Sequence, residues 1–297
     1  MNDATAQADW RAWLGRERVL EDVIDPGRAR AMQATLDDSA EGAGGAPAPL
    51  ETGAALPPLW HWLYFWTVAP WGRLGPDGHA ARGGFLPPIE LPRRMWAGSR
   101  VDFHRPLPLG AAARCRSVIA DIRFKQGRSG QLAFVTVRHE VSAEGTLCLS
   151  DEHDIVYREE PKAKAAPRPG PRPSEPAPAV PTWRREVRPD PVLLFRYSAL
   201  TFNGHRIHYD RPYATGVEGY PGLIVHGPLL ATYMVELARA QRPEASITHF
   251  AFRALSPIFD TAPFTVAGDP SDDGGGAELW VAGPQGELAM RGHVDFA

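Results

Sequence analysis

A proline-rich stretch divides the chain and limits what can fold on either side of it. Residues 161–181 read PKAKAAPRPGPRPSEPAPAVP, and eight of these twenty-one residues are proline. Proline fixes φ and lacks an amide hydrogen, so the stretch cannot belong to a regular sheet and tends toward extended polyproline II. The sequence therefore predicts a linker at 161–181, between an N-terminal domain, 1–160, and a C-terminal domain, 182–297.

Each half shows the same order of patterns, in which one apolar helix precedes several strands. A buried helix is predicted at 57–70, PPLWHWLYFWTVAP, because two prolines suit a first helical turn and the run is apolar nearly all round. A buried strand is the weaker interpretation. The second half has its helix at 228–241, PLLATYMVELARAQ. Strands are expected at 100–107, 112–125, 132–143 and 147–158, and again at 247–259, 264–268, 277–283 and 287–296.

Smaller features complete the pattern. An amphipathic helix is predicted near 8–20, a hairpin turn at 126–131, and an irregular segment over 182–221. The stretches RVDFHRPLPLG and FAFRALSPIFD share a basic residue and a proline near the strand end, which is a faint internal repeat. The pattern indicates an α+β protein made of two antiparallel sheets, each with one helix. Two unrelated α+β domains remain open on the pattern alone.

The composition argues against several classes of protein. The net charge is −3 with both signs scattered along the chain, so no basic surface for nucleic acid is indicated. Two cysteines, Cys115 and Cys148, are too few for a disulfide scaffold. The N-terminus is polar, unlike a signal peptide, and no apolar run is long enough to span a membrane. We expect a soluble cytoplasmic protein that binds neither nucleic acid nor membrane.

The chemically informative residues gather at 195–234, FRYSALTFNGHRIHYDRPYATGVEGYPGLIVHGPLLATYM. His208 can act as a base because imidazole titrates near working pH. Gly227 precedes Pro228 at the predicted start of a helix, where unpaired N–H groups and the positive dipole end can stabilise negative charge. Pro228 has no N–H, so Gly227 and Leu229 would be the donors.

This segment resembles the active-site region of the MaoC-like (R)-specific enoyl-CoA hydratases and dehydratases. It is most similar to their double-hotdog branch, which includes 3-methylfumaryl-CoA (mesaconyl-CoA) hydratases and mitochondrial 3-hydroxyacyl thioester dehydratases. The first half resembles that branch in LPPLWHWLYF, GGFLPP, LPRRMWAG and FHRPL. The family motif ends in an aliphatic residue and His, here Ile207 and His208. Asn203 replaces the family's Asp, and His205 and Arg206 replace its Asn and Pro.

The resemblance implies a tandem hotdog fold, in which each half is an antiparallel sheet wrapped around one apolar helix. It implies reversible addition of water to an unsaturated acyl-CoA, without metal or other cofactor, in the second half; the first half would be non-catalytic and form groove walls. His208 would be the base, Asn203 would position water, and Gly227 would stabilise the thioester oxygen. Further substrate contacts are expected from Arg196, Tyr197, Arg206, His226 and Leu229. A homodimer of double-hotdog chains is the assembly considered.

Arginines near the motif bear on the acyl group. Arg196 and Arg206 flank the motif, and Arg82, Arg93 and Arg94 lie in predicted loops of the first half. Because arginine pairs bidentately with carboxylates, a short dicarboxylic acyl group is predicted, such as mesaconyl or itaconyl, hydrated to citramalyl-CoA. Each arginine could instead lie on the surface or bind the phosphates of coenzyme A.

Other interpretations stay open. His208 could be a buried structural histidine, Asn203 could cap a turn, and Asp210 looks like a helix N-cap. The set His208, Asp210 and His226 could hold non-haem iron. The fold could instead hydrolyse the thioester with Glu218 as the carboxylate. It could also bind an acyl thioester without turnover, because the family's Asp has become Asn203.

Overall fold

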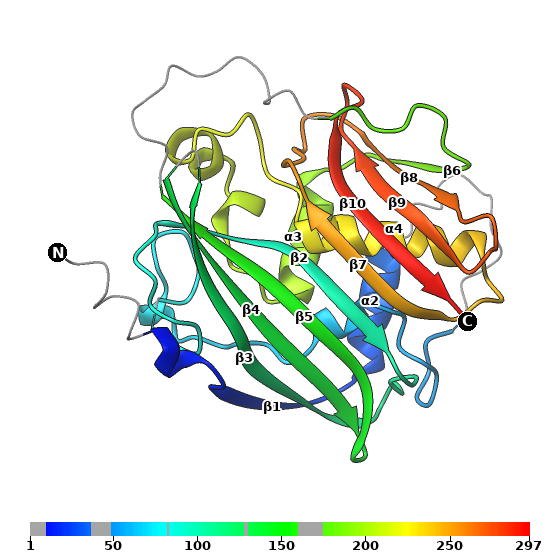
Figure 1. The fold of residues 1–297 in the computed structure, drawn as a ribbon, viewed down its shortest axis with the longest axis horizontal. Helices are drawn as coiled ribbons and strands as arrows, with labels where there is room; N and C mark the ends of the chain where they lie inside the picture. Colours follow the sequence, from blue (N-terminus) through cyan, green and yellow to red (C-terminus); the bar gives the residue numbers. More distant parts are fainter. Residues whose placement is uncertain (1–9, 37–48, 82, 128–129, 160–174) are drawn as a thin grey trace.

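The computed structural model describes residues 10–36, 49–81, 83–127, 130–159 and 175–297. Within them, ten strands form one antiparallel sheet in the order β1-β3-β4-β5-β2-β7-β10-β9-β8-β6 (Figure 1). The strands of the first half are β1 (Glu17–Val23), β2 (Arg93–Phe103), β3 (Ala112–Gly127), β4 (Gly130–Ala143) and β5 (Thr146–Arg158). Those of the second half are β6 (Trp183–Val187), β7 (Ile247–Ala254), β8 (Phe264–Pro270), β9 (Gly276–Ala282) and β10 (Leu288–Phe296).

The two halves of the sheet have the same topology. Read from its outer edge, each half runs first, third, fourth, fifth and second strand, and the halves meet where β2 pairs with β7. An isolated bridge follows each central strand, Ala55 with Pro108 in the first half and Ile224 with Phe259 in the second. The predicted internal repeat is therefore confirmed, and the alternative of two unrelated domains is wrong.

The long helix of the second half forms as predicted. Helix α4 (Gly227–Gln241) packs on the strands of its own half from β6 to β10, and most of its side chains are buried. Two shorter helices, α2 (Pro26–Leu36) and α3 (Pro191–Leu200), contact each other behind the centre of the sheet (Figure 1). One buried apolar core joins both halves and includes residues such as Val101 and Phe250 from the paired central strands.

The prediction of an irregular segment over 182–221 is partly wrong, because β6 and α3 lie within it. Helix α3 begins after Asp190, whose carboxylate accepts the N–H of Leu193 at 2.8 Å, and Pro191 occupies the first turn. The helix predicted near 8–20 is also wrong. A 3-10 turn, η1 (Arg11–Trp13), precedes β1 there, and alternate residues of β1 are exposed in the two-residue period of a strand.

Several other predictions fare better. The strands predicted at 112–125, 132–143 and 147–158 match β3, β4 and β5 closely. Gln126 pairs with Gln131, which confirms the hairpin at 126–131, although its tip at 128–129 lies outside the described residues. Cys115 and Cys148 are buried free thiols. No helix in the described parts of the chain has both the length and the apolar character needed to span a membrane.

The helix predicted at 57–70 is wrong, so the apolar helix expected inside the first half is missing there. A single 3-10 turn, η3 (Trp60–Leu63), forms in its place. Leu59 and Phe65, which flank the turn, have φ of 70° and 59°. An α-helix cannot continue through such left-handed residues, which explains why only one turn is left.

A buried carboxylate explains this departure from helical pattern. Asp151 of β5 is 0% exposed. It accepts hydrogen bonds from Trp62 at 2.8 Å, Ser99 at 2.8 Å, His61 at 3.0 Å and His153 at 2.7 Å. Burial alone would raise the pKa of Asp151, but the charge and hydrogen bonds of His153 and His61 outweigh it and hold that pKa well below its ordinary value. The η3 segment therefore adopts a conformation in which His61 and Trp62 donate hydrogen bonds to Asp151. These tertiary hydrogen bonds override the local helix propensity.

Candidate active site

His208 lies at the end of the 3-10 turn η5 (Arg206–His208) and is 7% exposed. Its Nδ1 lies 2.7 Å from the carbonyl oxygen of Ile224. A carbonyl only accepts hydrogen bonds, so Nδ1 carries the proton and Nε2 of the neutral ring keeps its lone pair. Burial lowers the pKa of His208 to about 4, although the hydrogen bond to Ile224 opposes the shift. At neutral pH the side chain is therefore an uncharged base with a fixed tautomer.

The structure brings His208 next to the start of α4. The rings of His208 and His226 stack with centroids 3.7 Å apart and an angle of 18° between planes. His226 directly precedes Gly227, the first residue of the helix. The N–H groups of Gly227 and Leu229 have no hydrogen-bond acceptor among the described residues, as expected for a helix N-terminus. A base and a pair of free donors therefore share one place in the fold.

Gly227 is not required by the fold. Its φ is not in the left-handed region, and an added Cβ would meet only the terminal methyl of Met290, at 3.9 Å. Next to it, His226 Nε2 lies 2.8 Å from the Ser198 hydroxyl, whereas the buried His226 Nδ1 has no partner among the described residues. The helix start thus offers open space and unused hydrogen-bonding capacity to a ligand.

Asn203 caps a turn. Its Oδ1 accepts the backbone N–H of His205 at 3.0 Å, so the turn-cap interpretation is confirmed. That oxygen is therefore already engaged, and the amide hydrogens are what remain to hold a water or a substrate oxygen. A role for Asn203 in positioning water stays a prediction, now as a donor.

The predicted substrate-binding residues differ in how many hydrogen bonds they already make within the protein. Arg206 is fully engaged: it donates to Asp210 at 2.9 and 2.7 Å and to the carbonyl of Pro76 at 2.9 Å, and it stacks on Tyr213. Arg196 is exposed and donates to the carbonyl of Ala34 in α2, at 3.2 Å.

Tyr197 and Leu229 are buried, and Tyr197 packs against His226 with ring centroids 4.9 Å apart. Their predicted contacts with substrate, like those of His226, stay predictions. Arg82 lies outside the described residues.

The alternative carboxylates are occupied by the protein. Asp210 accepts the N–H of Tyr213 at 3.1 Å and caps the turn that leads into the π-helical segment η6 (Tyr213–Val217), as the N-cap interpretation predicted. Glu218 accepts the hydroxyl of Tyr213 at 3.1 Å and lies 3.8 Å from Arg93. Neither carboxylate is held free for water attack on a thioester.

A loop of the first half contacts this site, a contact that no sequence pattern predicted. Residues 75–79, GPDGH, follow the 3-10 turn η4 (Trp71–Arg73), and the Arg206 N–H donates to the Asp77 carbonyl at 2.9 Å. The ring of His79 lies 4.1 Å from that of His205. No local sequence pattern indicates which segment this loop contacts.

Metal-ligating residue types cluster in one place in the described part of the chain. Asp77, His79 and His205 have ligand atoms within 4.8 Å of one another. His79 Nδ1 already lies 3.1 Å from Asp77 Oδ2, a hydrogen bond that accounts for the pair without an ion. The set predicted for non-haem iron, His208, Asp210 and His226, is not brought together among the described residues.

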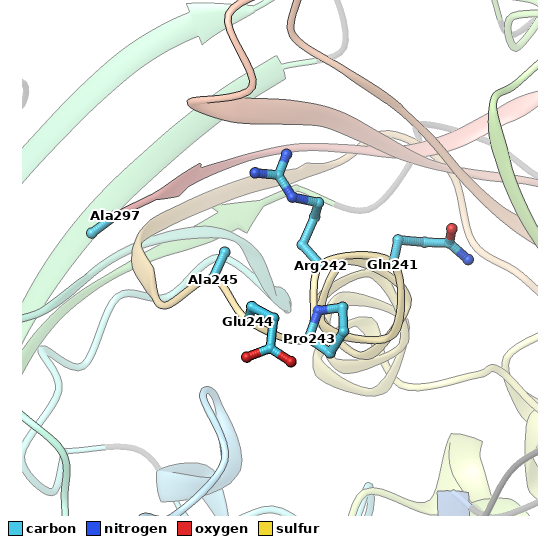
Figure 2. A pocket seen from close by; sticks show the side chains of 6 residues that line it. All are labelled: Gln241, Arg242, Pro243, Glu244, Ala245 and Ala297. Carbon is cyan, nitrogen blue, oxygen red and sulfur yellow. The ribbon is translucent and has the colours of Figure 1, made fainter.

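Two surface hollows lie away from the site. One is at the end of α4, lined by Gln241, Arg242, Pro243, Glu244, Ala245 and Ala297 (Figure 2). The other lies along β1 and β3. Neither contains a residue predicted for catalysis or substrate binding.

Comparison with known proteins identifies the family. The family model for hydroxyacyl-thioester dehydratase type 2 matches residues 59–260. The mesaconyl-C(4)-CoA hydratase of Chloroflexus aurantiacus is 50% identical over 293 residues, 98% of this chain and 99% of the relative. The chain belongs to the hydroxyacyl-thioester dehydratase type 2 family. It is a carbon–oxygen lyase that hydrates or dehydrates acyl thioesters.

More distant relatives of this dehydratase-family chain support the same family and the same fold. The mitochondrial hydroxyacyl-thioester dehydratase type 2 of Schizosaccharomyces pombe is 29% identical over 84% of this chain and 88% of its own. A conserved hypothetical protein of Mycobacterium tuberculosis with a double hotdog fold covers 95% of this chain and 96% of its own, at 14% identity and a TM-score of 0.55. Other structural neighbours are MaoC-like dehydratases. The resemblance to MaoC-like double-hotdog hydratases and the α+β fold class are confirmed.

The buried position of His208 predicts an unusual pH profile. With the neutral ring as the predicted base and its pKa at about 4, kcat/KM should stay level from pH 8 to about 5 and fall only as the pH drops through about 4. An exposed histidine would lose activity near pH 6.5. The measurement is kcat/KM for enoyl-CoA from loss of enoyl absorbance, with circular dichroism at each pH to verify folding. A half-maximal point near 6.5 would contradict the assignment.

Proposed function

We propose that this enzyme adds water reversibly to a short, branched, dicarboxylic enoyl-CoA, with 3-methylfumaryl-CoA (mesaconyl-CoA) giving citramalyl-CoA as the leading substrate. The observation that carries the proposal is the 50% identity to a mesaconyl-C(4)-CoA hydratase over 98% of the chain. The pairing of a neutral His208 with free N–H groups at the start of α4 supports the same chemistry.

The reaction follows from these groups. Nε2 of His208 takes a proton from water while the water oxygen bonds to the β carbon. The electron pair of the double bond moves toward the thioester, and the N–H groups of Gly227 and Leu229 stabilise the charge that develops on its oxygen. The proton then passes from the imidazolium to the α carbon. One base suffices, because the proton removed from water is the one that the α carbon needs.

The topological repeat supports a single site in the second half. The bridges Ala55 to Pro108 and Ile224 to Phe259 occupy equivalent places, so Pro57 and Pro58 of the first half correspond to His226 and Gly227. Proline has no N–H to donate. The first half therefore lacks the N–H donor that Gly227 supplies, because proline occupies the equivalent position.

Arg94 is our candidate for contact with a substrate carboxylate. It lies on β2, is half-buried and has no ion-pair partner in the described part of the chain. Burial is the main cause that lowers the pKa of His205, and the charge of Arg94 adds a smaller effect, which places Arg94 within electrostatic range of that ring. Arg93 and Arg206, by contrast, already face carboxylates of the protein.

Competition between substrates tests the acyl group. We expect wild-type enzyme to prefer 3-methylfumaryl-CoA over crotonyl-CoA by at least about 100-fold in kcat/KM, since a buried carboxylate–arginine contact contributes several kcal/mol. Arg94→Ala should remove most of that preference and leave crotonyl-CoA turnover nearly unchanged. Itaconyl-CoA is the third substrate of the panel. Preference of the wild-type enzyme for crotonyl-CoA would remove the carboxylate contact from the proposal.

Gly227→Ala tests the close approach of substrate to the helix start. An added Cβ meets nothing closer than 3.9 Å, so the thermal midpoint should stay within a degree or two of wild type, whereas KM should rise or kcat fall by about tenfold. Differential scanning fluorimetry and steady-state kinetics measure the two effects. Unchanged kinetics would show that the substrate does not approach Gly227.

A further inference from the structure

The loop at 75–79 of the first half is built onto the catalytic motif of the second. The Asp77 carbonyl accepts the Arg206 N–H at 2.9 Å, and the Pro76 carbonyl accepts the Arg206 guanidinium at 2.9 Å. Gly78 has a φ of +88°, and a Cβ there would lie 1.9 Å from the carbonyl oxygen of Gly204. Only glycine fits this contact, so the loop is held against residues 203–206 with no space between the two backbones.

The side chains of the same loop continue this contact. Asp77 accepts hydrogen bonds from the backbone N–H of His79 at 3.0 Å and from its ring Nδ1 at 3.1 Å. The His79 ring lies 4.1 Å from the His205 ring at 41°. His205 in turn meets His208 edge to face, with centroids 5.5 Å apart at 89°. An unbroken line of contacts thus runs from Asp77 to the base.

His205 is the member of this line that is available to a ligand. Its backbone N–H is fixed by Asn203, and its ring is only partly buried and makes no hydrogen bond among the described residues. His79 on one side and His208 on the other define where that ring can lie. The titratable and charged groups around it are Asp77 and His79 of the loop, His208 of η5, and Arg94 of β2.

We infer that Asp77 and His79 are positioning residues, which hold the His205 ring beside His208 as the second hydrogen-bonding group of the hydration site. His205 then supplies, from a site shared by both halves, a polar contact to water or substrate of the kind that an Asp at position 203 would give. The inference rests on the proposed hydration reaction and goes beyond it, because it makes the first half part of the active site.

Three variants and a matched control test it. Asp77→Asn and His79→Ala should each lower kcat by about 10- to 100-fold with a smaller change in KM, since a misplaced group near the reacting atoms costs this much. His79→Asn keeps a donor at the Nδ1 position for Asp77 but lacks the ring, so it should behave like His79→Ala. The control is Asp102→Asn, which breaks the similar pair of Asp102 with His249, 2.6 Å apart, where β2 meets β7. Its kcat should match wild type.

Titration of the histidine rings by NMR provides a readout that needs no turnover. Burial and His79 lower the pKa of His205, so in His79→Ala that pKa should rise toward its ordinary value, while Asp102→Asn leaves it unchanged. A wild-type enzyme inactive on every enoyl-CoA would refute the proposed function, and the His205 titration would still decide the positioning role.

Unchanged kcat and unchanged His205 titration in both Asp77→Asn and His79→Ala would overturn the inference. So would one equivalent of a transition metal retained by wild type and lost in His79→Ala, because the three side chains would then be metal ligands.

Discussion

His208→Ala is expected to lower kcat by about 100-fold or more, which is the usual contribution of a general base. The substitution removes the Nε2 lone pair, and among the described residues no carboxylate is held free beside it: Asp210 is paired with Arg206 and Glu218 with Tyr213. KM should change less, because the N–H groups at the start of α4 remain in place. Hydration of 3-methylfumaryl-CoA, followed by absorbance, measures both constants.

A matched variant separates catalysis from stability. His249→Ala removes an imidazole that pairs with Asp102 on the central strands, so it should lose some stability and keep full activity. In His208→Ala the stack on His226 is lost, and the thermal midpoint reports that loss separately from the rate. Turnover of His208→Ala within a few-fold of wild type would refute the role of this side chain as the base.

Patterns that depend on one element were predictable from the sequence. The strands β3 to β5 and β8 to β10 are amphipathic or buried runs bounded by turns, and α4 is apolar nearly all round, so the local pattern and the fold agree. The motif around His208 lies within one segment, and its place beside Gly227 followed from the resemblance. Short strands such as β6 have too few residues for the two-residue alternation of apolar and polar side chains to be recognised.

Features that depend on distant partners were not predictable. The segment at 57–70 reads as a helix until Asp151, some ninety positions later, is known to accept hydrogen bonds from His61 and Trp62. The contact of His79 with His205 joins residues from the two halves, and neither local sequence indicates the other. Both cases involve polar side chains buried by the tertiary fold, where a hydrogen-bond partner decides the conformation.

Asp151→Asn is expected to destabilise the protein by about 3–5 kcal/mol at pH 7, the usual cost of breaking a buried charged network from one side. The amide replaces an acceptor with a donor at a site where Trp62, Ser99, His61 and His153 all converge on the carboxylate. Because these hydrogen bonds hold η3 in place, the substitution should also disorder the η3 segment, which packs inside the first half. Urea unfolding followed by tryptophan fluorescence measures it.

The pH dependence of stability in the same variant distinguishes the loss of the carboxylate charge from the loss of the hydrogen bonds that the carboxylate accepts. The pKa of Asp151 is held well below its ordinary value in the folded state, so its contribution to stability is present above about pH 4, the unfolded pKa, and is lost as the pH falls below that. As the pH falls below about 4, wild type should therefore lose stability more steeply than Asp151→Asn. Asp102→Asn, whose carboxylate is exposed, should follow wild type closely. Parallel curves for wild type and Asp151→Asn would mean that the carboxylate is not ionised in the core, and that its hydrogen bonds alone hold η3 in place.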